Sequence, residues 1–329
     1  MASRRSVRRA TARTPGSKPE RERPSSRRTF IVITLVFLAV IAISIVIGFY
    51  FFVWKDLWRP VLRVNDETIN MDYFLRRLKD YDNTYGTYDI ETMLLNITIE
   101  EIIRQRAPDY GIEVTSDEID EWLWNEALGE NETISESEFQ AWYRNALNVT
   151  QFSDAEYRAL VEIAIMQERL DEYLRAVVPT EAEQVHLYII IVSSGADAAA
   201  AIARIEDGED FSDLARELSI EEESAEQGGD IGWWPYLGGL NDNLESWAFS
   251  LEVGEVSGLM TLDEEGTVWA ICMVMEKQSN RVIEEDKLET IRDKIFDEWL
   301  YYELDTVDSE RFIDNDETRA WIHLQMAKD

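Results

Sequence analysis

The chain has 329 residues, enough for one or two domains with cores of their own, and 45% of them are hydrophobic and 11% aromatic. This composition excludes a wholly disordered chain. The net charge of −34 is unevenly distributed, because ten Lys/Arg and two Glu give residues 1–28 a charge of +8 and leave −42 for the remainder. We expect the basic tail to be disordered, and the apolar segment beside it argues against nucleic-acid binding.

Residues 29–54 carry no charge and form an apolar run longer than the about 20 residues that span a bilayer as a helix. The run is also longer than the apolar region of a signal peptide, and it ends in aromatic residues suited to a membrane interface. The positive-inside rule places residues 1–28 in the cytoplasm. We therefore expect a single-pass protein of the cell membrane, anchored in the lipid bilayer through residues 29–54, with its C-terminal part outside the cytoplasm.

Cysteine and histidine are scarce. The single cysteine, Cys272, lies in an apolar, strand-like run, where a buried structural thiol is expected. The two histidines, His186 and His323, are far apart, and no Cys/His cluster or glycine-rich nucleotide motif is present. The sequence therefore predicts no metal site and no cofactor, and it predicts stability from packing alone.

Residues 59–179 are expected to form a mostly helical domain. A short strand precedes the first amphipathic helix, and apolar residues continue at helical spacing beyond it. A further helix, N-capped by Thr115 or Ser116, runs to a break at residues 147–157. The long helix that follows ends near Pro179.

The pattern changes in residues 180–278, where β-rich and helical runs alternate. The expected elements are a strand (184–192), two helices broken at Gly208 (197–219), a glycine-rich loop (224–235), a short helix (240–251) and two strands (254–260 and 266–277). This β-α-α-(loop)-α-β-β order predicts a small domain of the α+β class. Residues 279–329 begin with another amphipathic helix.

Four segments of the middle domain carry a family resemblance. GEDFSDLARELS, SAEQGGDIGWW, WAFSLEVGEVSG and the strand ending in MEK have the order and spacing of parvulin-type (PpiC-like) peptidyl-prolyl isomerases. The flanking residues resemble the helical chaperone region of SurA-like and PrsA-like folding factors, and the apolar anchor resembles that of PpiD-like foldases. The resemblance implies a rotamase domain (180–278) inserted in a chaperone domain (59–179), which residues 279–329 complete by packing back on it.

The resemblance also implies a binding site for proline. Its pocket positions correspond to Ile231, Leu240, Leu244 and Phe249, and an apolar notch with an aromatic wall suits a proline ring. From the residues themselves, Gly228 and Gly229 permit backbone conformations that a Cβ would hinder, and the Asp230 carboxylate can accept hydrogen bonds from nearby backbone amides. Trp233 and Trp234 are expected to cover apolar surface.

The polar positions of the family are altered. Glu221 lies where the family has Cys or Asp, so Glu221 and Asp230 are the candidate catalytic groups. Ile189 lies where the family has its first histidine, and Ala270 or the neighbouring Trp269 lies where it has the second. His186 lies three residues before Ile189, and an odd shift in a strand turns a side chain to the opposite face.

Three functions follow from this pattern. The first is a membrane-anchored prolyl isomerase that acts on X-Pro bonds of unfolded or nascent exported chains. The second is a chaperone that binds such clients without isomerisation, and the third is an adaptor for one partner at the membrane. For the chaperone, the charge of −42 would favour basic clients, and it could equally reflect a general acidity of the host's proteins.

Overall fold

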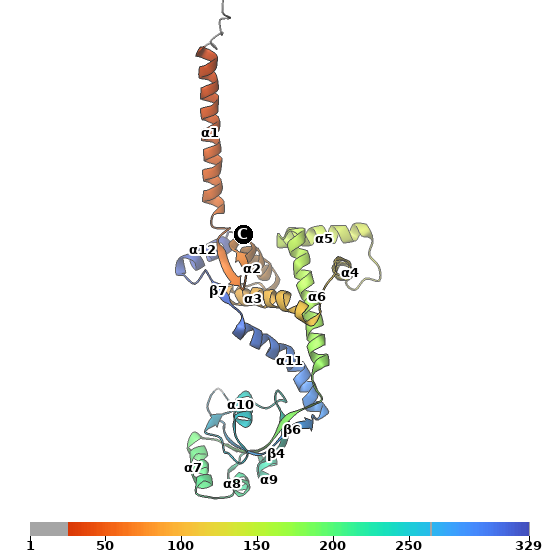
Figure 1. The fold of residues 1–329 in the computed structure, drawn as a ribbon, viewed down its shortest axis with the longest axis vertical. Helices are drawn as coiled ribbons and strands as arrows, with labels where there is room; N and C mark the ends of the chain where they lie inside the picture. Colours follow the sequence, from red (N-terminus) through yellow and green to blue (C-terminus); the bar gives the residue numbers. More distant parts are fainter. Residues whose placement is uncertain (1–25, 264, 329) are drawn as a thin grey trace, which may run out of the picture. The chain divides into compact units, whose positions relative to one another are not determined.

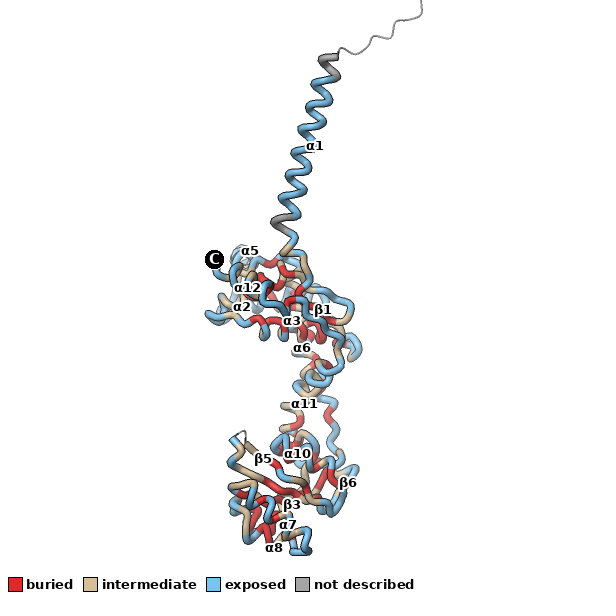
Figure 2. The backbone as a smooth tube through the Cα atoms, turned by 90° about the vertical axis from the view of Figure 1, so that its left-hand side faces the viewer, coloured by how far each residue is buried: buried red, intermediate tan, exposed pale blue. Residues whose placement is uncertain are grey.

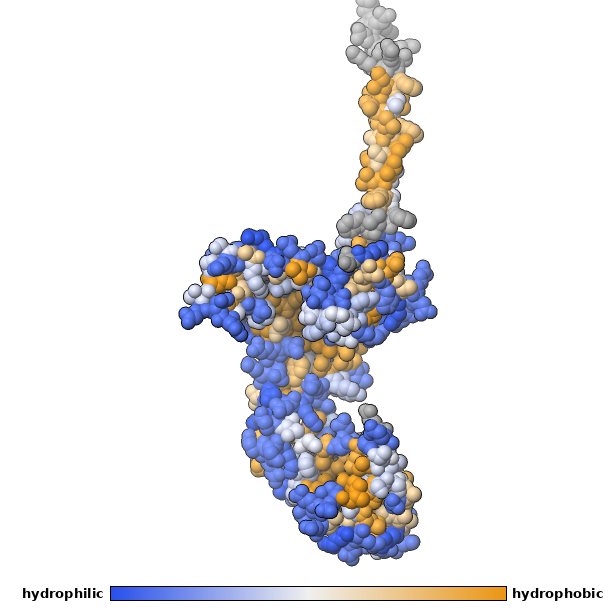
Figure 3. Space-filling view, turned by 180° about the vertical axis from the view of Figure 1, so that it is seen from behind, coloured by the Kyte–Doolittle hydropathy of each residue, from blue (hydrophilic) through white to orange (hydrophobic). Residues whose placement is uncertain are grey.

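The computed structural model describes residues 26–263 and 265–328, so most of the predicted basic tail lies outside the described residues. The first of two compact units, which ends at Arg59, contains helix α1 (Ser26–Trp54). Its Phe30–Phe51 stretch has a mean hydropathy of 3.3, and its surface is hydrophobic (Figure 3). By length and composition α1 can cross a membrane, a criterion that signal sequences also meet.

The second unit begins at Pro60 and contains a helical part and a sheet-rich part (Figure 1). The helical part is built from segments at both ends of the unit. These are β1 (Pro60–Val64), β2 (Glu67–Asn70), α2 (Met71–Tyr85), α3 (Ile90–Arg106), the 3₁₀ helix η1 (Ala107–Tyr110), α4 (Ser116–Leu128), α5 (Glu136–Thr150), α6 (Asp154–Val177), α11 (Glu285–Thr306), β7 (Ser309–Arg311) and α12 (Asp316–Met326).

The C-terminal segment returns to the start of this unit. Strand β7 pairs antiparallel with β1, which also pairs with β2, so the small sheet has the order β2-β1-β7. Helix α11 packs against α6 and α3, where Phe296 and Trp299 join the apolar cluster of Ile103, Met166 and Leu170. These contacts connect residues that are more than a hundred positions apart in the sequence.

Helix caps explain where the helices of this part begin. Thr115 is the N-cap of α4, as predicted, and forms a capping box with Glu118. The predicted single helix from this cap to residue 146 is wrong, because Gly129 ends α4 with a φ of +54° and Ser135 begins α5 with a second capping box.

The sheet-rich part contains a four-stranded antiparallel sheet of order β4-β3-β6-β5. Its elements are β3 (Glu181–Val192), α7 (Gly195–Glu206), α8 (Phe211–Leu218), α9 (Glu222–Glu226), β4 (Asp230–Pro235), α10 (Asp242–Ser250), β5 (Met260–Thr261) and β6 (Trp269–Val282). The predicted element order needs a correction: residues 230–235 form the edge strand β4, and the short helix α9 precedes it. The expected strand at 254–260 is reduced to a bridge at Val256 and the start of β5.

Alternating side chains of β3 face two separate apolar clusters. Figure 2 marks buried residues along β3. Val185, Leu187 and Ile189 face a cluster completed by α10 and β6, whereas Ile190 and Val192 face a cluster completed by α7 and α8. Cys272 is buried in the first cluster, and burial raises the pKa of its thiol to about 11, so the prediction of a buried structural thiol is confirmed.

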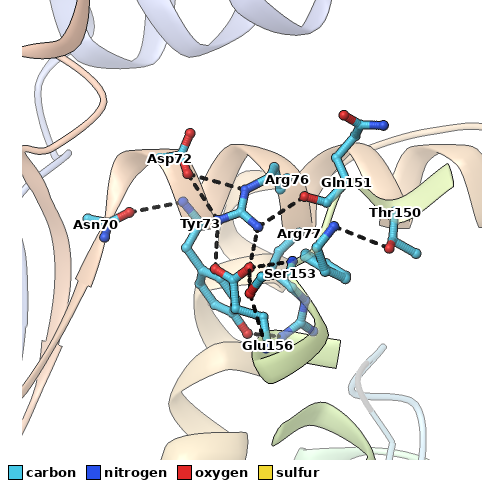
Figure 4. A network of polar contacts seen from close by, with 10 residues as sticks. Asn70, Asp72, Tyr73, Arg76, Arg77, Thr150, Gln151, Ser153 and Glu156 are labelled. Atoms are coloured by element: carbon cyan, nitrogen blue, oxygen red, sulfur yellow. Dashed lines mark hydrogen bonds and ion pairs between the residues drawn. The ribbon is translucent and has the colours of Figure 1, made fainter. Parts of the chain in front are cut away.

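Arg76 of α2 forms an ion pair with Glu156 at the start of α6 (Figure 4). Both terminal nitrogens of Arg76 lie 2.7 Å from the oxygens of Glu156, and Nη2 also lies 3.0 Å from Asp72 Oδ2. Glu156 is the capping-box residue of α6 and accepts hydrogen bonds from the backbone and hydroxyl of Ser153. Partial burial opposes the charge of Glu156, but Arg76 and Ser153 outweigh it and lower the pKa of Glu156 to about 2.

Replacing Glu156 with Gln is expected to lower the free energy of unfolding at pH 7 by about 2 kcal/mol, because a hydrogen-bonded charge pair is lost. The pKa of Glu156 falls from an ordinary 4.5 to about 2 in the folded chain. Its stabilising contribution is therefore complete above pH 4.5 and is lost as the pH falls towards 2.

Urea unfolding of the full chain in detergent micelles at several pH values should show the difference between wild type and Glu156→Gln shrinking with acidification. Arg76→Gln, which removes the other half of the pair, should follow the same profile. A difference that stays constant from neutral to acid pH would show that Arg76 does not hold Glu156 ionised.

Candidate functional site

The glycine pair before β4 fixes the loop against the central strand. Gly228 and Gly229 have φ values of +71° and +87°, which confirms the prediction that these positions use glycine conformations. The carbonyl of Gly229 accepts a 2.7 Å hydrogen bond from the amide of Ile189, and the amide of Gly229 donates to the Ser224 carbonyl. A Cβ on Gly229 would lie 2.7 Å from the Ile189 carbonyl oxygen, so only glycine allows this approach.

Asp230 begins β4 and accepts a 2.8 Å hydrogen bond from the amide of Gly232, which confirms the predicted bond to a backbone amide. The same Oδ1 also lies 2.8 Å from Nε2 of His186, a partner that was not predicted. Partial burial opposes the charge of this carboxylate, but the Gly232 amide and His186 outweigh burial and lower the pKa of Asp230.

The two tryptophans of β4 lie on different sides of the strand. The Trp233 ring stacks on His186 with centroids 5.1 Å apart, and the Arg281 guanidinium lies 4.4 Å from the Trp233 ring centroid. Trp234 packs against the apolar cluster that contains Ile189, so the predicted covering of apolar surface holds for this residue. His186 alternates with Val185 and Leu187 on β3, which confirms that its side chain faces away from that cluster.

Glu221 is the N-cap of the short helix α9. Its oxygens accept hydrogen bonds from the amides of Glu223 (3.1 Å) and Ser224 (2.7 Å). The pKa of Glu221 is lowered, most strongly by the neighbouring Ser224 hydroxyl and less strongly by these two amides. That hydroxyl is near enough to stabilise the charge but lacks the geometry of a hydrogen bond. The carboxylate is thus ionised and held in place.

These groups surround one cavity of about 530 Å³, which we call the polar pocket. Of the six predicted site residues, it brings together Glu221, Asp230 and Ile231. His186, which sequence analysis placed away from the apolar site, belongs to the same lining. The complete lining is His186, Glu221, Glu223, Ser224, Gln227, Asp230, Ile231 and Gly232.

The other predicted substrate-binding residues lie on the opposite face of the sheet. Leu240 and Leu244 are buried in the apolar cluster, with 8% and 4% of their surface exposed, and Phe249 is half-buried against it. Ile231 also packs against this cluster, so it joins the apolar face to the polar pocket. We call the surface formed by Ile231, Trp234, Leu240, Leu244 and Phe249 the apolar face.

The two residues that the resemblance aligns with the family's histidines also belong to this side of the sheet. Ile189 and Ala270 lie on the adjacent strands β3 and β6, and both are buried in the apolar cluster. Neither supplies a polar group. Across residues 26–263 and 265–328, no group of three or more His, Cys, Asp or Glu side chains is arranged to hold a metal ion.

Comparisons with known proteins agree with this geometry. The rotamase family described as the PPIC-type PPIASE domain matches residues 192–276. The foldase protein PrsA of Oceanobacillus iheyensis is 30% identical over 169 residues, which cover 49% of this chain and 54% of that protein. PrsA of Streptococcus gordonii is 26% identical over 62% of this chain and 64% of that protein. The chain thus spans between half and two thirds of these relatives.

Solved structures of similar proteins include the crystal structure of PrsA from Bacillus cereus. It has 16% sequence identity and a TM-score of 0.36, and the match covers 83% of this chain and 92% of that chain. On the family match, residues 192–276 belong to the PPIC-type parvulin family of peptidyl-prolyl isomerase domains, and the chain that carries them is a relative of the PrsA foldases.

Proposed function

We propose that this protein is a membrane-anchored, extracytoplasmic folding factor whose parvulin domain accelerates isomerisation of X-Pro bonds in unfolded exported chains. The observation that carries the proposal is the family match over residues 192–276, which contain β4, β5, the first part of β6 and the apolar face. The relatives named foldase PrsA support the same role.

Isomerisation requires a site that favours the twisted imide over both planar forms. The barrier of about 20 kcal/mol comes from the partial double bond of the imide, and no nucleophile is needed to lower it. The apolar face can take the proline ring and remove water from the imide. Glu221 and Asp230, the candidate polar groups, lie in the polar pocket next to Ile231.

We also propose that different segments of the chain have different roles. Residues 59–179 and 279–329 would form one helical chaperone domain with the parvulin domain, residues 180–278, inserted in it. The pairing of β7 with β1 and the packing of α11 on α6 support this arrangement. Helix α1 would anchor the protein in the bilayer, with residues 1–28 in the cytoplasm, and its length and hydropathy support that role.

A second candidate function is binding of unfolded clients without isomerisation. The specific observation in its favour is the apolar character of Ile189 and Ala270, which occupy the two histidine positions and are both buried. The side of the sheet that faces the apolar cluster therefore lacks the polar pair that the family resemblance implies.

An isomerisation assay distinguishes the isomerase from the chaperone without isomerase activity. Short X-Pro peptides that differ in the residue before proline are mixed with the full chain in detergent micelles, and NMR measures the rate of cis–trans exchange. We expect acceleration, and we expect Phe249→Ala to reduce it by at least about tenfold, because a pocket that loses much of its apolar wall binds proline poorly. Val253→Ala, at a position that is 58% exposed in the same domain, is the control and should leave the rate unchanged.

The folded state of each variant is checked by hydrogen exchange of β3 and β6. If the folded wild type gives no acceleration, the isomerase proposal fails for such peptides. Suppression of aggregation of an unfolded client would then support the second function. Acceleration that Phe249→Ala leaves intact would remove the apolar face from the mechanism.

A further inference from the structure

The loop between β4 and α10, residues 236–241, contacts helix α11, which belongs to the helical part of the unit. The Leu237 side chain packs against an apolar cluster that contains Leu288 of α11. Just before the loop, Nζ of Lys287 on α11 donates a 2.8 Å hydrogen bond to the Trp233 carbonyl. Apolar and polar contacts therefore hold this end of β4 and its loop on α11.

The backbone of the loop adopts an unfavourable conformation at Leu237. Its φ is +60°, in the left-handed region that residues with a side chain rarely enter. Such a conformation persists only where surrounding contacts impose it, and it is most frequent at ligand sites and switch regions. The strain at Leu237 thus indicates that the position of this loop matters.

Tyr236 connects α11 with the apolar face. Its hydroxyl donates a 2.8 Å hydrogen bond to Glu298 Oε1 on α11. This hydrogen bond is the main cause that raises the pKa of Tyr236 to about 12, so the hydroxyl stays a donor at neutral pH. The Tyr236 ring also meets the ring of Phe249 edge to face, with centroids 5.8 Å apart and an angle of 86° between the planes.

These contacts give Tyr236 a role other than filling the core. Half of its surface is exposed, so its burial contributes little to the hydrophobic core. An edge-to-face aromatic pair has a preferred geometry, and a Tyr236 ring anchored at its hydroxyl restricts the orientation of the half-buried Phe249 ring. A side chain that is already ordered binds a ligand more tightly, because less entropy is lost on binding.

We propose that Tyr236 is a positioning residue for proline binding. Anchored to Glu298 of α11, it holds the Phe249 ring in the orientation that the proline ring of a client meets. The affinity of the parvulin domain for proline then depends on a helix of the helical part. This role rests on the proposed function, since it presupposes that the apolar face binds proline.

The NMR exchange assay, repeated at increasing concentrations of one X-Pro peptide, gives its dissociation constant and the exchange rate at saturation. We expect Tyr236→Ala to weaken binding about fivefold, in line with the strength of an aromatic pair. The saturating rate should not change, because Phe249 contacts the proline ring in the planar and twisted states alike. Added to Phe249→Ala, Tyr236→Ala should cause no further loss, since it acts through that ring.

Fluorine NMR of the full chain labelled with fluorophenylalanine tests the anchor without any peptide. The signal of Phe249 is the one that Phe249→Leu removes. Glu298→Ala should shift this signal and weaken peptide binding as much as Tyr236→Phe does, because each variant removes the same hydrogen bond. Glu298→Gln keeps an acceptor oxygen and should restore both properties. Asp297→Ala is the control, because it removes a charge from an exposed neighbour on α11, and it should change neither.

Several outcomes would overturn the positioning role while the proposed function stands. One is a Tyr236→Ala variant that binds the peptide like wild type. Another is a further loss of binding when Tyr236→Ala is added to Phe249→Ala, which would show that Tyr236 contacts the client itself. A Phe249 signal that Glu298→Ala leaves in place would overturn the anchor on α11. A folded wild type that neither binds nor isomerises the peptide would overturn the proposed function, and the positioning role with it.

Discussion

Replacing Gly229 with Ala is expected to unfold the parvulin domain or to destabilise it by more than about 3 kcal/mol. Two costs add at this position. A φ of +87° disfavours a side chain, and the new Cβ would lie 2.7 Å from the backbone oxygen of Ile189. Relief of that overlap requires the loop to move away from β3, which breaks the hydrogen bond between the Ile189 amide and the Gly229 carbonyl.

Gly254→Ala is the matched control, because Gly254 has a φ of +85° and a Cβ at this position would meet no atom within 4 Å. It should show the conformational cost alone, about 1–3 kcal/mol. Hydrogen exchange of the full chain in micelles reports the two parts of the second unit separately. We expect β3 and β6 to lose protection in Gly229→Ala while α3 and α6 keep theirs. Equal effects of the two variants would show that the contact with Ile189 carries no strain.

Local signals in the sequence account for most of the elements. Thr115 marks the start of α4, and Gly208, with a φ of +97°, separates α7 from α8. The start of α5 was not predicted, although Ser135 and Glu138 form a readable capping box. Strand β7 has only three residues and depends on pairing with β1, so no local pattern identifies it.

Some features of the site follow from local sequence, whereas others depend on tertiary structure. The glycine conformations and the Asp230 bond to a backbone amide follow from a few neighbouring residues. The contact of His186 with Asp230 does not, because it arises from the antiparallel register that places His186 opposite Trp233. Reading residues 230–235 as a loop concealed that register, and with it the polar pocket.

The burial of the predicted proline pocket also depends on tertiary packing. Leu240 and Leu244 have the residue types that suit a proline notch, but their exposure depends on how α10 packs against the sheet. Because Leu244 is 4% exposed, an acidic substitution there would disrupt the core as well as any binding. The half-buried Phe249 is therefore the better position at which to test the apolar face.

A buried ion pair between α2 and α3 is expected to give the largest single loss of stability in the helical part. Arg77 reaches Glu100 through two contacts, Nη1 to Oε2 at 2.5 Å and Nη2 to Oε1 at 2.7 Å, and it donates to the Tyr73 hydroxyl at 3.1 Å. The Arg77 side chain is only 11% exposed. Burial opposes its charge, but Glu100 and Tyr73 outweigh burial and raise the pKa of Arg77.

Arg77→Met should lower the free energy of unfolding by about 3 kcal/mol, because it leaves Glu100 partly buried without its counter-ion. The double variant Arg77→Met/Glu100→Met should recover most of that loss, since an apolar pair of similar volume needs no desolvation of charge. Urea unfolding of the full chain in micelles measures both. If the double variant is as unstable as the single one, the loss comes from the shape of the arginine and its Tyr73 contact. Recovery would instead show that α2 and α3 pack well without charge.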